Sequence, residues 1–138
     1  AEHMHYMANF ISEKWNLAGR MGTSIASSLV GMTPDDVLII ITKPPFAKRT
    51  ISAASEASAV GANVIVITDT HSCPALKFAN QSFIVPTESD NFFSSYAATL
   101  VLIETIIGML ASRAGENAQE RITKVEDTTT RLGEVWDG

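Results

Sequence analysis

Two runs of apolar residues predict strands that are buried on both faces of a sheet. Residues 37–41 (Val-Leu-Ile-Ile-Ile) and 64–67 (Val-Ile-Val-Ile) contain no polar side chain. Strands of a parallel sheet show this composition because helices cover both of their faces. The segment between them, residues 48–60, is rich in alanine and is followed by Gly61, a common signal for the end of a helix. The pattern predicts a strand–helix–strand unit with a right-handed crossover.

Shorter elements on both sides continue this alternation. After the unit, the pattern predicts a short helix, a short strand, a long helix and a polar surface helix, at residues 72–79, 82–85, 90 or 91 to 113, and 116–136. Before it, the pattern predicts a helix, a short strand and a second helix, at residues 2–13, 15–18 and 23–30. Alternating strands and helices are typical of an α/β three-layer sandwich built on a parallel sheet. Because such a domain usually opens on a strand, we expect the first strand of the sheet to precede Ala1.

The composition indicates one globular domain over residues 1–138, with 46% hydrophobic and 18% charged residues. The formal net charge of −5 argues against a nucleic-acid-binding surface over the whole chain. The single cysteine, Cys73, excludes an internal disulfide and a cysteine-based metal site, as is typical of a cytoplasmic protein. Residues 97–111 are the most hydrophobic stretch, but Glu104 interrupts them and they fall short of the ~20 residues that span a bilayer. We therefore expect a buried helix there and no membrane partner.

Three loops follow the carboxyl ends of the predicted strands, where open parallel sheets bind ligands. The first, residues 42–50, carries Lys43, Lys48 and Arg49 beside a predicted helix N-terminus. The helix dipole disfavours positive charge at that end, and a bound anion would relieve the conflict. The alternative is that these long side chains simply extend into water.

The other two loops offer polar groups that have either a ligand-binding or a local structural explanation. Asp69 could bind a ligand hydroxyl, although such residues more often stabilise a turn. In the loop at residues 86–95, Thr87 and Ser89 offer donors for sugar or phosphate oxygens, and Glu88 could act as a general base. Helix capping by the following acidic and amide residues explains that loop equally well. His71 has no paired carboxylate or nucleophile, and the sequence contains no metal or triad motif, so we predict neither a catalytic nor a metal site.

The order of these segments resembles the SIS (sugar isomerase) domain family. Asp35-Asp36 and the strand after them resemble the second conserved strand of that family. A loop, an alanine-rich helix, Gly61-Ala62, a strand ending in Thr68-Asp69 and the Ser-Cys-Pro-Ala-Leu segment at 72–76 follow in the same order. Three further features resemble the effector-binding half of RpiR-type transcriptional regulators: the Pro-Phe loop ending in Thr50, the Val-Pro-Thr-Glu-Ser run at 85–89 followed by two phenylalanines, and the polar C-terminal helix. The resemblance covers about residues 6–136.

The resemblance implies a flavodoxin-like sandwich, a homodimer and a sugar phosphate effector, with no enzymatic activity and no cofactor. It also implies that a helix-turn-helix domain outside this chain binds DNA. The phosphate loop of the family typically has the pattern Ser-x-Ser-Gly-x-Thr, of which Thr42 matches the first serine. Pro44, Pro45 and Ala47 replace the other conserved positions, which removes two hydroxyls and two potential amide donors. Charge from the lysines and the arginine of this loop could compensate.

These considerations together give eight candidate ligand-binding residues. They are Thr42, Lys43, Lys48, Arg49, Thr50, Thr87, Glu88 and Ser89. Two alternatives to a sensor domain remain at this point. A sugar-phosphate isomerase of the same fold would need an acid/base pair, for which Glu88 is the only loop candidate. A dimerisation module that binds no ligand is consistent with the altered phosphate loop.

Overall fold

The computed structural model describes residues 1–20 and 22–136, which divide into two compact units. The first unit contains Leu17–Val101 together with Ala1, and the second contains Glu2–Asn16 and Leu102–Gly138. The prediction of one domain over residues 1–138 stays a prediction.

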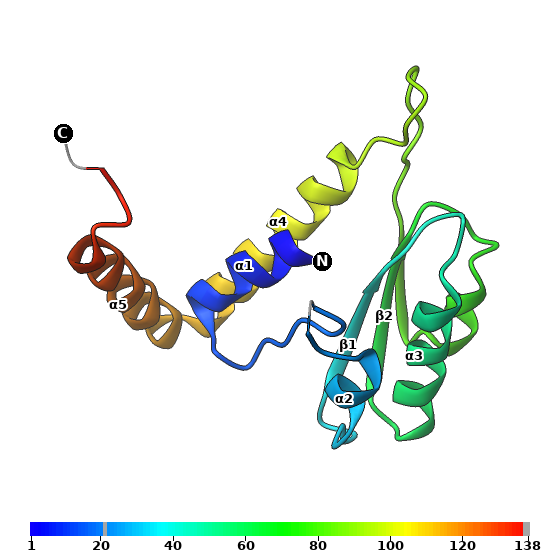
Figure 1. Cartoon of the computed structure of the whole chain (residues 1–138), viewed down its shortest axis with the longest axis horizontal. Helices are drawn as coiled ribbons and strands as arrows, with labels where there is room; N and C mark the ends of the chain where they lie inside the picture. The colour runs from blue at the N-terminus through cyan, green and yellow to red at the C-terminus, as the bar shows by residue number, and fades with distance from the viewer. Residues whose placement is uncertain (21, 137–138) are drawn as a thin grey trace. The chain divides into compact units, whose positions relative to one another are not determined.

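The first unit is built on a parallel sheet of three strands (Figure 1). The strands are β1 (Val37–Ile41), β2 (Asn63–Thr68) and β3 (Gln81–Ile84), in the order β1-β2-β3. Both pairings are parallel, so the carboxyl ends of all three strands lie at one edge of the sheet. The sequence placed these strands within one residue at each end, because continuous apolar runs mark strands that are covered on their faces. The predicted α/β class and parallel sheet are confirmed.

Helices pack on this sheet through small side chains. Helix α3 (Lys48–Ala59) contacts β1 and β2 and also the short helices α2 (Ile25–Leu29) and η1 (Pro74–Phe78, a 3₁₀ helix). Its inner face is alanine, with Ala54 and Ala57 fully buried against the β2 valines. Gly61 then takes a φ of +83°, a conformation that only glycine adopts without strain, and returns the chain to the sheet. Figure 1 shows α3 running alongside β2.

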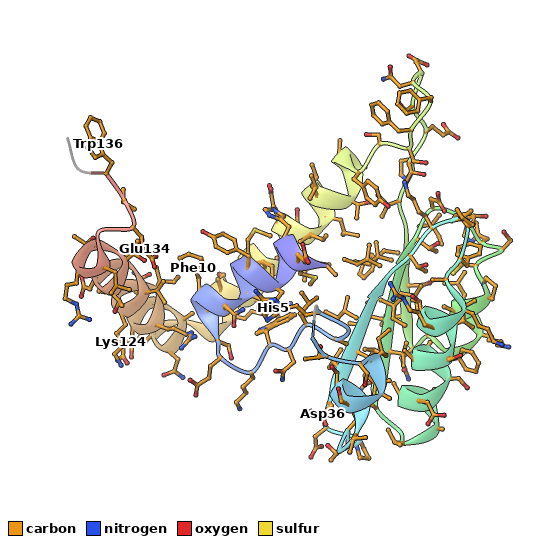
Figure 2. The ribbon with its side chains drawn as sticks, viewed as in Figure 1. His5, Phe10, Asp36, Lys124, Glu134 and Trp136 are labelled. Atoms are coloured by element: carbon orange, nitrogen blue, oxygen red, sulfur yellow. The ribbon has the colours of Figure 1, made fainter. Side chains whose placement is uncertain are left out.

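The second unit consists of helices. Helix α1 (Glu2–Ile11) packs against α5 (Glu116–Leu132), and the Arg121 guanidinium donates a 2.8 Å hydrogen bond through Nε to the Asn9 carbonyl. Helix α4 (Ala97–Ala114) begins in the first unit and continues into this one, where Glu104 lies 3.6 Å from His3 of α1. Gly115, with a φ of +57°, separates α4 from α5. Trp136 follows the end of α5 and is fully exposed (Figure 2).

Helix α4 is more exposed than the sequence predicted. Its exposed apolar side chains include Val101 and Met109, which are 64% and 53% exposed, whereas Ile103 and Ile107 are buried. Among the described residues it is the one helix that is long and apolar enough to cross a membrane by length and composition alone, a test that core helices of soluble proteins also pass. The expectation of a buried helix at residues 97–111 is therefore wrong within this chain. Apolar side chains occur on most sides of the helix, and the described chain covers only part of it.

Other predictions about the elements are also wrong. Residues 15–18 form no strand, because a strand needs a partner for its backbone and no described segment pairs with them. Helix α4 begins at Ala97 rather than at Asp90 or Asn91, because the Ser95 amide bonds the Thr87 carbonyl at 2.9 Å and closes residues 87–95 into a loop. The last helix ends at Leu132, where Gly133 adopts the left-handed conformation and supplies the C-cap.

Candidate functional site

A pocket lies at the carboxyl edge of the sheet, within the first unit. Its empty volume is about 260 Å³, part of which is open to solvent. The residues that line it come from the ends of β1 and β2, from the loop after β3 and from the first turn of α4. They are Ile41, Thr42, Lys43, Ile67, Thr68, Asp69, Thr87, Tyr96 and Thr99. Four threonine hydroxyls, one carboxylate and one ammonium group thus surround a small space where parallel sheets commonly bind ligands.

Asp69 links the ends of two strands inside this pocket. The Thr87 hydroxyl donates a 2.6 Å hydrogen bond to Asp69 Oδ2. The other carboxylate oxygen, Oδ1, is buried and has no hydrogen-bond partner among the described residues. The Thr68 hydroxyl next to it is likewise buried and unpartnered within the described chain. Leaving a polar group buried without a partner costs about 1–3 kcal/mol, so a ligand that supplies partners here gains binding energy.

Lys43 is held against an aromatic ring on the wall of the pocket. Its Nζ lies 4.0 Å from the centroid of the Tyr96 ring, in a cation–π contact. The salt bridges in the described part of the chain join His3 to Glu104 and Arg121 to Glu13, so neither Lys43 nor Asp69 belongs to one. The pocket therefore offers a cationic and an anionic group that form no salt bridge with each other.

The predicted ligand residues separate into two groups in space. Thr42, Lys43 and Thr87 line the pocket, as the strand-end argument predicted. Lys48, Arg49 and Thr50 form the first turn of α3 outside the pocket lining, and the side chains of the first two are exposed. The N-cap residue of this helix is Ala47, which provides no side-chain cap for the amide groups of the first turn.

Glu88 and Ser89 are not brought into the pocket. Glu88 is exposed, and Ser89 Oγ accepts a 3.1 Å hydrogen bond from the Asn91 amide. Ser89 thus has a local turn role. The alternative for this loop, capping of a helix by Asp90 or Asn91, is wrong, because α4 begins only at Ala97. Both residues are outside the pocket lining in the described structure, although the loop that carries them begins at Thr87.

A family model and solved structures agree with this architecture. The SIS domain model matches residues 3–109, which is most of the chain. The chain belongs to the SIS-domain family. No curated protein matches the SIS domain described here.

Two solved structures show the same fold at low sequence identity. The sugar isomerase domain of the RpiR transcription factor from Sphaerobacter thermophilus has a TM-score of 0.78 and 16% identity, with 91% of this chain and 70% of that chain covered. The NanR protein of Vibrio vulnificus, complexed with ManNAc-6P, has a TM-score of 0.75 and 14% identity over 95% of this chain. The chain spans about half the length of NanR, with 50% of that protein covered. These similarities confirm the SIS fold that the sequence predicted.

Sequence reasoning missed three hydroxyl-bearing residues of the pocket and undervalued its carboxylate. Thr68, Tyr96 and Thr99 line the pocket without having been predicted, and Asp69, which was interpreted as a turn residue, is its one carboxylate. Thr68 ends an apolar strand with a polar residue and Asp69 follows it directly, and this signal could have identified both. Tyr96 and Thr99 give no such signal, because their position depends on how α4 approaches the sheet.

The chemistry of the pocket suits binding of a polyol. Hydroxyls and a carboxylate can exchange hydrogen bonds with sugar hydroxyls, and the ammonium group can bind an anion. His71 is exposed and outside the pocket lining, and Cys73 is buried in the core beneath η1. Within residues 1–20 and 22–136, no group of three or more histidine, cysteine or acidic residues could hold a metal ion.

Proposed function

We propose that this SIS domain is the effector-binding domain of an RpiR-type transcriptional regulator and that it binds a sugar phosphate at the strand-end pocket. The observation that carries the proposal is the pair of buried, unpartnered oxygens, Thr68 Oγ1 and Asp69 Oδ1, in that pocket. Support also comes from the two similar structures, one of an RpiR transcription factor and the other of a protein complexed with the sugar phosphate ManNAc-6P.

The distribution of charge indicates how such a ligand lies. The sugar hydroxyls bond to Asp69, Thr68 and Thr87, because a carboxylate and threonine hydroxyls supply matching acceptors and donors. The phosphate lies away from the carboxylate, toward Lys43 and the uncapped first turn of α3, where Arg49 adds charge. This arrangement binds the phosphate by charge instead of by the two loop hydroxyls typical of the family, at whose positions this chain has Pro44 and Ala47.

The pocket favours binding over catalysis. A sugar isomerase needs an acid and a base at the carbonyl, and the described pocket offers a single carboxylate with no partnered histidine. A sensor needs only reversible binding. Incubation of the chain with candidate sugar phosphates, followed by product analysis, distinguishes these alternatives, because an isomerase converts its substrate and a sensor returns it unchanged.

The exposed apolar surface of α4 supports a homodimer. Val101 and Met109 are more than half exposed on a helix that is rich in apolar residues, and isologous dimers commonly cover such surfaces. DNA is then bound by a helix-turn-helix domain outside this chain, in the cytoplasm. Analytical ultracentrifugation tests the dimer, and a clean monomer at micromolar concentration contradicts it.

Calorimetry with a panel of sugar phosphates tests ligand binding directly. The expected result is binding of at least one member of the panel that is lost with Asp69→Ala and retained with Glu56→Gln, an exposed carboxylate near the opposite end of α3. The matching unphosphorylated sugars should bind more weakly, because they make no charged contact with Lys43. Absence of binding by every sugar phosphate would refute the proposal and favour the dimerisation module.

A further inference from the structure

We infer that the pocket recognises an amino sugar phosphate whose free ammonium group binds Asp69 Oδ1 and Thr68 Oγ1, an inference that rests on the proposed function. These two oxygens come from consecutive residues at the end of β2, line the same pocket and are both buried without a partner in the described chain. A ligand group that binds there must form hydrogen bonds with both oxygens.

A phosphate does not fit this position. Asp69 Oδ1 is a carboxylate oxygen, and an anionic ligand group next to it would be repelled in a partly buried site. The Thr87 hydroxyl, which could have donated to a phosphate, already donates to Asp69 Oδ2. The inner end of the pocket therefore takes a hydrogen-bond donor, and the phosphate lies on the Lys43 side.

A hydroxyl and an ammonium group both meet the hydrogen-bonding requirement, but only the ammonium meets the charge requirement. A sugar hydroxyl can donate to Asp69 and accept from Thr68, which satisfies both oxygens but leaves the carboxylate charge without a counter-ion. No lysine, arginine or histidine of the described residues forms a salt bridge with Asp69, and the ammonium of Lys43 is held over the Tyr96 ring. An ammonium group on the ligand supplies the missing charge and donates to both oxygens at once.

An acetylated amine satisfies the site less well. Its amide can donate its one N–H to Asp69 but carries no charge, so it leaves the carboxylate without a counter-ion, as the hydroxyl does. The acetyl group also adds volume to a space of about 260 Å³, part of which is open to solvent. The expected order of affinity is free amine first, then the hydroxyl and acetamido compounds.

Calorimetry with glucosamine 6-phosphate, glucose 6-phosphate and N-acetylglucosamine 6-phosphate tests this order, since the three compounds differ only at one substituent. We expect the wild-type chain to bind the amine about fivefold to tenfold more tightly than the hydroxyl compound, because a charge-assisted hydrogen bond is about twice as strong as a neutral one. Asp69→Asn, which keeps the shape and an acceptor for Thr87, should reduce this preference to less than about twofold. Glu56→Gln removes a carboxylate that is exposed and outside the pocket lining, and should leave the preference intact.

The outcomes separate this inference from the proposed function. Equal affinity of the wild-type chain for all three compounds overturns the inference and leaves sugar phosphate binding standing. A preference for the amine that survives Asp69→Asn also overturns it, because the charge would then come from elsewhere. If Asp69→Asn does not fold, the wild-type comparison alone decides. Absence of binding by all three compounds and by the wider panel refutes the inference together with the proposed function.

Discussion

Replacing Thr68 by valine should make the ligand-free protein more stable while it weakens ligand binding. Thr68 is 3% exposed at the end of β2, and its hydroxyl is buried without a partner among the described residues. Valine has nearly the same shape and is also branched at Cβ, so it preserves the strand geometry and the packing. The substitution therefore removes the unpartnered hydroxyl and changes little else.

The expected gain follows from the cost of the buried hydroxyl. A polar group without a hydrogen bond costs about 1–3 kcal/mol in a protein interior, and the pocket is partly open to solvent, so we expect a gain of about 1–2 kcal/mol in unfolding free energy. With an unfolding entropy of about 2.1 cal/mol/K per residue, each kcal/mol raises the melting temperature of a 138-residue chain by about 3.5 °C. Thr68→Val should thus melt about 3–7 °C above the wild type.

Thermal unfolding followed by circular dichroism, without ligand, measures this shift. Thr68→Ser is the matched variant, because it keeps the hydroxyl and deletes the methyl group. It should lower the unfolding free energy by about 1 kcal/mol through lost burial. In calorimetry, Thr68→Val should weaken sugar phosphate binding by about 1 kcal/mol, which is about fivefold.

A lower melting temperature for Thr68→Val would refute the reasoning. It would mean that the hydroxyl has a stabilising partner in the ligand-free protein, such as a bound water. The argument that a ligand fills an unmet hydrogen-bonding requirement at this position would then lose its basis.

Three further predictions concern the rest of the chain. Arg49→Ala should weaken sugar phosphate binding by about 1.5–3 kcal/mol in calorimetry, because it removes the charged hydrogen bond that we propose to the phosphate, and should leave the melting temperature unchanged, because the side chain is exposed. Gly61→Ala should lower the unfolding free energy by about 1–2 kcal/mol in chemical denaturation, because the φ of +83° at this position strains any residue with a Cβ. Gly108 lies in the interior of α4 with open space for a Cβ, so Gly108→Ala should raise the unfolding free energy by about 0.5–1 kcal/mol. Hydrogen bonds from the backbone amide and the hydroxyl of Thr33 hold the pKa of Asp36 below its ordinary value of 3.8. The stability that this carboxylate provides is therefore present above pH 3.8 and is lost as the pH falls through the lowered pKa. Asp36→Asn should remove this loss of stability at acid pH, as measured by the unfolding free energy against pH.

Each of these predictions has a control and a contradicting outcome. For Arg49, Lys124→Ala removes an exposed cation from α5 and should not affect binding, and equal affinity of Arg49→Ala and wild type excludes a role in phosphate binding. If Gly61→Ala and Gly108→Ala change the unfolding free energy by the same amount in the same direction, the argument from the backbone conformation of Gly61 is contradicted. Asp36 lies on the turn before β1 (Figure 2). If Asp36→Asn loses as much stability at acid pH as the wild type does, the argument from the lowered pKa of Asp36 is contradicted.

The elements that the sequence predicted correctly are those with a local signal. Strands β1 and β2 are continuous apolar runs, and α3 begins at the predicted residue, Lys48, because the loop prolines exclude an earlier start. The failures are non-local. Residues 15–18 have a strand-like composition but no strand beside them, and α4 starts late because Thr87 and Ser95 pair across a loop.

The location of the candidate site could also be predicted from the sequence, but the full set of residues that line it could not. Carboxyl ends of parallel strands meet at one edge, which is why Thr42, Lys43 and Thr87 were predicted and do line the pocket. Lys48 and Arg49 are near them in sequence, yet the helical turn that contains them lies outside the pocket lining.

The sequence by itself thus determined the α/β class, the parallel strands and the edge of the sheet where the pocket lies, because hydrophobic periodicity and strand polarity are properties of short segments. Only the tertiary structure decided that Thr87 bonds Asp69 across 18 positions of sequence and that Lys43 lies over the Tyr96 ring. It also decided that Thr68 and Asp69 each keep a buried oxygen without a partner. Hydrogen bonds and burial depend on which segments pack together, and no short stretch of sequence contains that information.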